Sequence, residues 1–131
     1  MLQKAYSPIK LGELELKNRF IKSASFEGMS RKGKAEQRLI DFHSRMAEND
    51  VSLTTLAYGA INDNWLTNED QIVIDKKSGE FLQEISDAVH EKGGKISILL
   101  THCGYFTRST KFDSRKPLGP SRTLNKYGIM K

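Results

Sequence analysis

Three short apolar runs alternate with two amphipathic helical segments along the chain, and this alternation limits the folds that the chain can adopt. The runs lie at about 19–23, 51–57 and 95–101, and the helical segments lie at about 35–48 and 78–92. The runs are rich in β-branched and aliphatic residues, as strands are, whereas apolar positions in the helical segments recur at every third or fourth residue. Such alternation predicts parallel strands joined by right-handed crossovers, and therefore an α/β fold.

The ends of the helical segments carry recognisable signals. Asn49-Asp50 follows the first apolar stripe and is expected to end that helix. Ser78 is expected to cap the second helix, and Gly93-Gly94 is expected to end it, because hydroxyl side chains favour helix starts and glycine favours helix ends.

A β-hairpin is predicted ahead of the first strand, within residues 7–17. Apolar and polar residues alternate on either side of Gly12-Glu13, and Gly12 can supply the positive φ that a two-residue turn requires. The first strand follows with no room for a helix. The hairpin is therefore expected to cover one end of the sheet.

Small residues follow the first two predicted strands. The first runs into Ser23, Ala24 and Ser25, and the second runs into Gly59 and Ala60. Ligands of parallel α/β proteins bind at the carboxyl ends of the strands, so these positions are candidate ligand contacts. Close packing of the following loops is the alternative explanation.

The charge and the cysteine content exclude several classes of protein. The net charge of +5 is spread among acidic residues and becomes one-sided only after Phe106, so solvated lysines explain it better than nucleic-acid binding does. No apolar run approaches the roughly 20 residues of a membrane helix, and the amino terminus lacks the apolar core of a signal peptide. The single cysteine, Cys103, cannot form an internal disulfide. We expect a cytoplasmic protein that binds neither nucleic acid nor membranes.

His102 and Cys103 are the residues most suggestive of chemistry. A histidine can activate a neighbouring thiol, but adjacent residues of a strand point to opposite faces, so the two form a dyad only if the backbone has turned. A packing histidine and a small buried cysteine are the simpler interpretation. We therefore assign no catalytic residue within this chain and name His102 only as a candidate. One cysteine and three separated histidines predict no metal site.

Several motifs, taken in order, resemble one known family. Two segments resemble the opening of the old yellow enzyme family: Leu-Lys-Asn-Arg-Phe at 16–20 and Ser-Ala-Ser-Phe-Glu-Gly-Met at 23–29. This family contains flavin-dependent NADH:flavin oxidoreductases and 2,4-dienoyl-CoA reductases. Further matches follow at 88–96, 100–104 and 119–121. The family fold is an FMN-binding TIM barrel whose amino-terminal end is plugged by a hairpin.

The resemblance implies that residues 1–131 are the amino-terminal part of a single FMN-binding barrel domain. The chain would supply the hairpin and the first three βα units, in residues 18–104, followed by a loop in residues 105–131. A complete (β/α)8 barrel typically needs about 250 residues, so this barrel would be incomplete. The family's substrate-binding histidine pair, proton donor and phosphate-binding loops would lie beyond Lys131.

The resemblance also assigns cofactor contacts. Phe26 stands where other members place a residue that tunes the flavin. Leu99 stands where the family usually has a glutamine that hydrogen-bonds the pyrimidine edge of the flavin, and Tyr105 stands where an arginine is common. The residues expected to contact FMN are Ser23, Ala24, Ser25, Phe26, Ala57, Tyr58 and Leu99.

The function that this implies is FMN-dependent, NAD(P)H-driven reduction of an activated alkene, such as an enone or an enoyl thioester. The chain alone is expected to be inactive. A different class stays open, namely a non-catalytic truncated α/β module that pairs its open sheet edges with another chain or with a copy of itself. Leu99 in place of glutamine favours this module slightly.

Overall fold

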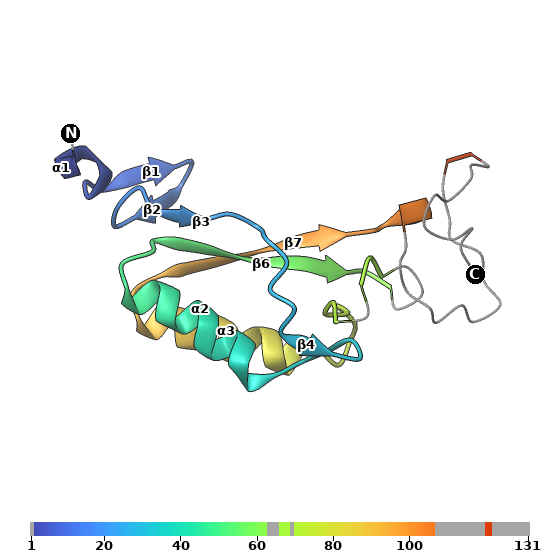
Figure 1. Ribbon diagram of the computed structural model, residues 1–131. Helices are drawn as coiled ribbons and strands as arrows, with labels where there is room; N and C mark the ends of the chain where they lie inside the picture. Colours follow the sequence, from blue (N-terminus) through green and yellow to red (C-terminus); the bar gives the residue numbers. More distant parts are fainter. Residues whose placement is uncertain (1, 63–65, 69, 107–119, 122–131) are drawn as a thin grey trace.

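A three-stranded parallel sheet organises the structure, which is a computed structural model that describes residues 2–62, 66–68, 70–106 and 120–121. The sheet has the order β3-β6-β7, formed by Ile21–Lys22, Leu53–Ala60 and Lys95–Thr101. The central strand, β6, pairs in parallel with both neighbours (Figure 1). The predicted α/β class and the parallel strands are confirmed.

The helices α2 (Gln37–Glu48) and α3 (Gly79–Glu91) pack side by side on one face of this sheet (Figure 1). The register places Leu56 of β6 beside Ile98 of β7 on the face toward the helices. The core cluster consists of Leu39, Ile40, Leu56, Ile72 and Ile85. Their burial provides the main driving force for this layered arrangement.

The opposite face of the sheet carries no helix among the described residues. The register places Ile21, Thr55, Ser97 and Leu99 on this face. Ile21 is 50% exposed and Leu99 is 40% exposed, so apolar side chains lie open here. We call this surface the open face.

The predicted hairpin is confirmed. β1 (Ile9–Leu11) and β2 (Leu14–Leu16) pair antiparallel, and Gly12 has the expected positive φ of 60°. A short helix, α1 (Leu2–Ala5), precedes the hairpin. The hairpin lies near the end of the sheet where the parallel strands begin (Figure 1).

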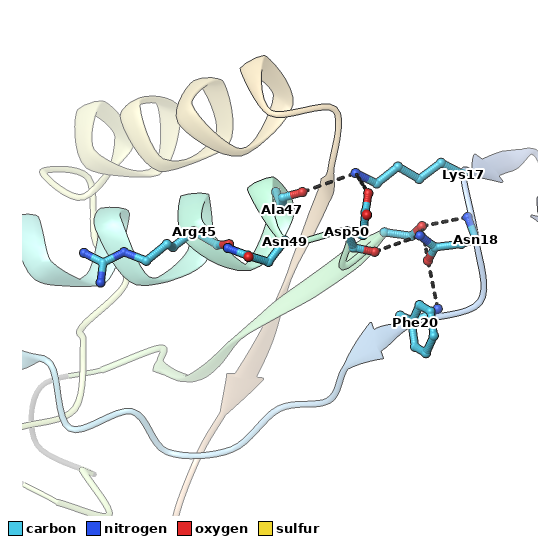
Figure 2. Close-up of polar contacts among 8 residues, drawn as sticks. Lys17, Asn18, Phe20, Arg45, Ala47, Asn49 and Asp50 are labelled. Carbon is cyan, nitrogen blue, oxygen red and sulfur yellow. Dashed lines mark hydrogen bonds and ion pairs between the residues drawn. The ribbon is translucent and has the colours of Figure 1, made fainter. Parts of the chain in front are cut away.

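Asn18 joins the hairpin to the start of β6. Its backbone N–H donates to Ser52 Oγ at 2.8 Å, and its Oδ1 accepts hydrogen bonds from Ser52 Oγ at 2.7 Å and from the Phe20 N–H at 3.0 Å. Its Nδ2 donates to the carbonyl oxygen of Asp50 at 2.7 Å (Figure 2). Because Asn18 is buried, these bonds fix the point from which β3 starts.

Replacing Asn18 with alanine is expected to lower the free energy of unfolding by about 2 kcal/mol, because the buried Ser52 hydroxyl and Phe20 N–H lose their acceptor. Urea denaturation would measure the difference. Asn49→Ala is the matched control, because the exposed Asn49 side chain donates a single bond, to the Arg45 carbonyl. Its expected loss is below about 0.5 kcal/mol, and equal losses in the two variants would contradict an anchoring role for Asn18.

One predicted helix start is wrong, and one predicted cap residue is in place but makes no capping hydrogen bond. The first helix begins at Gln37 instead of Ala35, because β4 (Ser30–Arg31) and β5 (Lys34–Ala35) form a second antiparallel hairpin. Ser78 occupies the position before α3, but its hydroxyl makes no capping bond. Instead, Ser78 Oγ donates to the Asp75 carbonyl at 2.7 Å and accepts the Asp75 N–H at 3.0 Å.

Other boundaries agree with the sequence or shift slightly. The second predicted strand continues through the small residues, because β6 ends at Ala60. α3 ends at Glu91 and Gly93 has a φ of 71°, as the glycine pair predicted. Of the predicted loop 105–131, residues 105–106 belong to a short 3-10 helix (Gly104–Phe106), and most of the rest lies outside the described residues.

Within the part of the chain that the structure describes, no helix is long and apolar enough to cross a membrane.

Candidate functional site

A β-bulge interrupts β6 near its carboxyl end. Leu56 pairs with Ile98 and Gly59 pairs with Leu100, so Ala57 and Tyr58 face the single intervening residue of β7. Two residues opposite one define a bulge, which bends the strand and redirects its side chains. Tyr58 has a φ of 55°, in the left-handed region that large residues rarely adopt. Because strained backbone concentrates at functional sites, the bulge marks a candidate site.

Most of the predicted cofactor contacts gather around this bulge. Leu99 is the residue opposite it, and the ring centroids of Phe26 and Tyr58 lie 6.2 Å apart with their planes at 52°. Phe26 is 41% exposed, whereas the side chain of Ala57 is buried. The structure therefore brings together Phe26, Tyr58 and Leu99 at the carboxyl end of the sheet.

The small residues of the first strand end lie in the segment that leads from β3 to Phe26. Ser23 and Ser25 are exposed and Ala24 is half-buried. Exposed small side chains leave the backbone of this segment accessible. We call residues 23–26 the small-residue turn.

A buried charged cluster lies between this turn, β6 and α2. The register places Lys22 beside Thr54 on the helix side of the sheet, and Lys22 Nζ donates hydrogen bonds to Glu27 Oε1 and to the Thr55 carbonyl, the latter at 3.0 Å. The side chains of Lys22 and Glu27 are 13% and 5% exposed. Lys22 Nζ also lies 5.5 Å from the centre of the Phe42 ring. We call Lys22, Glu27 and His43 the charged cluster.

His43 comes to the cluster from α2 and is fully buried. Its Nδ1 lies 2.7 Å from Thr54 Oγ1, within hydrogen-bond distance. Its Nε2 lies 3.6 Å from Glu27 Oε1, which is longer than an ordinary hydrogen bond, and it has no closer partner among the described residues. Lys22 is therefore the direct partner of the Glu27 carboxylate, and His43 is a more distant one.

The pKa of Glu27 is lower than that of an ordinary glutamate. Burial is the largest single influence on this pKa and raises it, because the charged form is desolvated. The side chains of His43 and Lys22 lower this pKa, as does a backbone hydrogen bond, and these influences together outweigh burial. The carboxylate is therefore the favoured form in the folded chain.

The acid side of the stability profile is expected to depend on Glu27. A pKa that is lower in the folded chain than in the unfolded chain adds stability that is fully present above 4.5, the ordinary value. That stability is lost as the pH falls through the lower folded-state pKa. Urea denaturation at a series of pH values should therefore show that the difference in free energy of unfolding between wild type and Glu27→Gln shrinks as the pH falls below 4.5 and through the folded-state pKa of Glu27.

Glu48→Gln is the control for this measurement, because Glu48 is 56% exposed in its ion pair with Lys92. This variant should follow the wild-type profile throughout. A gap between wild type and Glu27→Gln that stayed constant down to acid pH would contradict the assignment.

His102 and Cys103 follow the last residue of β7, at the same end of the sheet as the bulge. His102 is exposed, and its Nδ1 accepts the Gly104 N–H at 3.2 Å. Cys103 is half-buried, and its Sγ contacts the Gly104 carbonyl at 3.7 Å. No hydrogen bond joins the two side chains among the described contacts, so the catalytic role of His102 stays a prediction.

Sequence reasoning missed the charged cluster. Lys22 belongs to a strand, where a lysine is normally assigned to the solvent side, and Glu27 was read as part of a motif without a role of its own. The available signal was the pairing itself. A lysine in an apolar strand precedes a glutamate at the start of a glycine turn. If both side chains point toward the helix layer, the two opposite charges can pair with each other in the interior.

Comparison with known proteins gives one matching family. Residues 4–127 match the family described as NADH:flavin oxidoreductase / NADH oxidase. The chain is 33% identical over 120 residues to 4,4′-dithiodibutanoate disulfide reductase of Rhodococcus erythropolis, covering 92% of this chain and 30% of that protein. It is 32% identical over 122 residues to the probable N-methylproline demethylase of Rhizobium meliloti (strain 1021), covering 87% of this chain and 17% of that protein.

Solved structures share the fold. Morphinone reductase in complex with tetrahydroNAD superposes with a TM-score of 0.80 at 23% identity, covering 89% of this chain and 32% of that chain. The old yellow enzyme homologue of Zymomonas mobilis superposes with a TM-score of 0.81 at 21% identity, covering 92% of this chain and 34% of that chain. The chain thus spans 17% to 34% of the length of these four proteins.

Proposed function

Because the chain belongs to the NADH:flavin oxidoreductase / NADH oxidase family, we propose that it forms the amino-terminal part of an FMN-dependent oxidoreductase barrel. The observation that carries this proposal is the strained bulge of β6. Phe26 lies beside Tyr58 of the bulge and Leu99 lies opposite it, at the strand ends where barrel enzymes bind their ligands.

The residues around the bulge fit a flat aromatic ring. The exposed side chains of Phe26 and Leu99 offer apolar contact, and the small-residue turn leaves backbone groups accessible. Residues 23–26, Tyr58 and Leu99 would therefore hold the isoalloxazine ring of FMN. Bound flavin supplies hydride-transfer chemistry, while the protein positions it and excludes water. Leu99 offers no hydrogen bond to the polar edge of the ring.

We assign to the complete barrel the NAD(P)H-driven reduction of a small activated alkene. Two relatives bear the names of a disulfide reductase and of a probable N-methylproline demethylase. A test of this assignment should therefore compare an alkene substrate with a substrate of another of these classes, such as a disulfide. The open face, in this proposal, lies toward the interior of the barrel, and β3 and β7 pair with its remaining strands.

An FMN titration of the chain, followed by quenching of flavin fluorescence, tests cofactor binding. Saturable quenching that is lost on unfolding in urea is expected. No saturation up to about 1 mM FMN, the range of very weak binding, would overturn the assignment of the bulge as a flavin contact.

The chain alone is expected to leave NADH unoxidised in the presence of 2-cyclohexenone. Co-expression with the carboxyl-terminal part of an old yellow enzyme homologue would supply further barrel units. Under the proposal, that assembly oxidises NADH faster with 2-cyclohexenone than with 4,4′-dithiodibutanoate. The reverse preference would overturn the alkene assignment.

A second candidate function rests on the open face. Ile21 is 50% exposed and Leu99 is 40% exposed, and β3 and β7 are the edge strands of the three-stranded sheet. Exposed apolar edges favour pairing with another chain. A non-catalytic module of this kind would form a stable complex in sedimentation experiments and would not bind FMN.

A further inference from the structure

The hydrogen-bond ladder between β3 and β6 ends before the small-residue turn. The two strands pair at Ile21 with Leu53 and at Lys22 with Thr54. Beyond Lys22, side chains make the contacts between the first strand end and β6. These contacts are the Lys22 bond to the Thr55 carbonyl, the Phe26 ring beside Tyr58, and a bond from the backbone of Ala57 to Glu27.

Glu27 connects the two parts of the site through its two carboxylate oxygens. Oε1 accepts a hydrogen bond from the ammonium group of Lys22, and Oε2 accepts one from the backbone N–H of Ala57 at 3.3 Å. Ala57 is the bulge residue whose N–H lies where the register of β6 shifts. An ionised carboxylate is an acceptor at both oxygens, so it can hold both donors at once.

We propose that Glu27 is a positioning residue that holds the bulge of β6 and the small-residue turn in a fixed relation. This proposal rests on the proposed function, because those two segments are the proposed flavin contacts. The carboxylate gives the displaced Ala57 N–H an acceptor and thereby supports the left-handed backbone of Tyr58. Its pairing with Lys22 and its proximity to His43 keep the charge in place.

Glutamine is the informative substitution, because it keeps the shape of the side chain and replaces one acceptor oxygen with a donor. In Glu27→Gln, either Lys22 or Ala57 faces an amide NH₂ group and loses its acceptor. Glu27→Asp is the second variant, because it keeps the buried charge opposite Lys22 while its shorter side chain withdraws from Ala57. It therefore keeps the test open if the glutamine variant does not fold.

Amide hydrogen exchange measures the predicted effect without any cofactor. Exchange at Ala57 is expected to rise about tenfold in both variants relative to exchange at Ile85, which lies in α3 and reports global opening. Glu48→Gln, on the exposed surface of α2, should leave this ratio unchanged. If exchange at Ala57 and Ile85 rises by the same factor, Glu27 stabilises the fold without positioning the bulge, and the proposal is overturned.

FMN affinity provides the second measurement. The dissociation constant from fluorescence quenching should rise about tenfold in Glu27→Gln and less in Glu27→Asp. A wild-type chain that binds no FMN would overturn the proposed function, and the exchange ratio would still decide whether Glu27 holds the bulge. An unchanged dissociation constant beside a raised exchange ratio would overturn the link between the bulge and the cofactor.

Discussion

Lys22→Met is expected to lower the free energy of unfolding by about 3–5 kcal/mol, because it removes the counter-ion of a buried carboxylate. The Glu27 side chain is 5% exposed, so solvent cannot replace the lost ammonium group. Methionine keeps most of the length of the lysine side chain and its contact with the Phe42 ring. The loss therefore reports the charge and its hydrogen bonds more than the packing. Urea denaturation near neutral pH provides the measurement.

The control for this prediction is Lys10→Met in the hairpin. Lys10 and Glu15 form an ion pair whose side chains are 72% and 74% exposed, and such surface pairs contribute about 0–1 kcal/mol. The double variant Lys22→Met with Glu27→Gln should recover part of the loss, because it removes the unpaired charge as well. A loss in Lys22→Met no greater than in Lys10→Met would show that the cluster is solvated in solution.

Leu99→Gln is expected to tighten FMN binding by about 1–3 kcal/mol, which corresponds to roughly 5- to 150-fold in the dissociation constant. Leu99 faces the bulge, and a glutamine there could donate to and accept from the polar edge of the flavin ring. The leucine leaves that edge without a side-chain partner at this position. Quenching of flavin fluorescence would measure both dissociation constants.

Leu100→Gln is the matched control, because the neighbouring leucine is also exposed but pairs with Gly59 beyond the bulge. It should not tighten FMN binding. Equal tightening in both variants would indicate that added polarity, and not the position of residue 99, is responsible. No tightening in Leu99→Gln would contradict the assignment of this residue to the polar edge of the flavin.

The sequence contained enough to predict the fold class. Periodicity distinguishes helix from strand, and Gly12 indicated the hairpin turn, so the alternation of elements and the hairpin are confirmed. The resemblance to the old yellow enzyme family is confirmed by the family match and by the structural neighbours. The two departures from the predicted helices, one early start and one missing capping bond, have local causes. Ala35 looked helical in sequence but pairs with Ser30, and the Ser78 hydroxyl found a partner in its own turn.

The candidate site was less predictable, because its geometry depends on contacts between distant residues. The motif placed Phe26, Tyr58 and Leu99 at strand ends, but a bulge has no composition of its own, so their convergence was not visible. Glu27 reaches Ala57 across 30 positions of sequence. The contact of FMN with these residues stays a prediction.

The buried Asn18 also constrains the order in which the chain can assemble. Its partners Asp50 and Ser52 lie 32 and 34 positions later in the sequence. During synthesis the hairpin emerges first, and the pairing of its two strands involves only residues close in sequence. Its junction with the sheet can form only after residues 50–52 have emerged and α2 has brought them back. Docking of the hairpin is therefore a late step, limited by closure of a long loop.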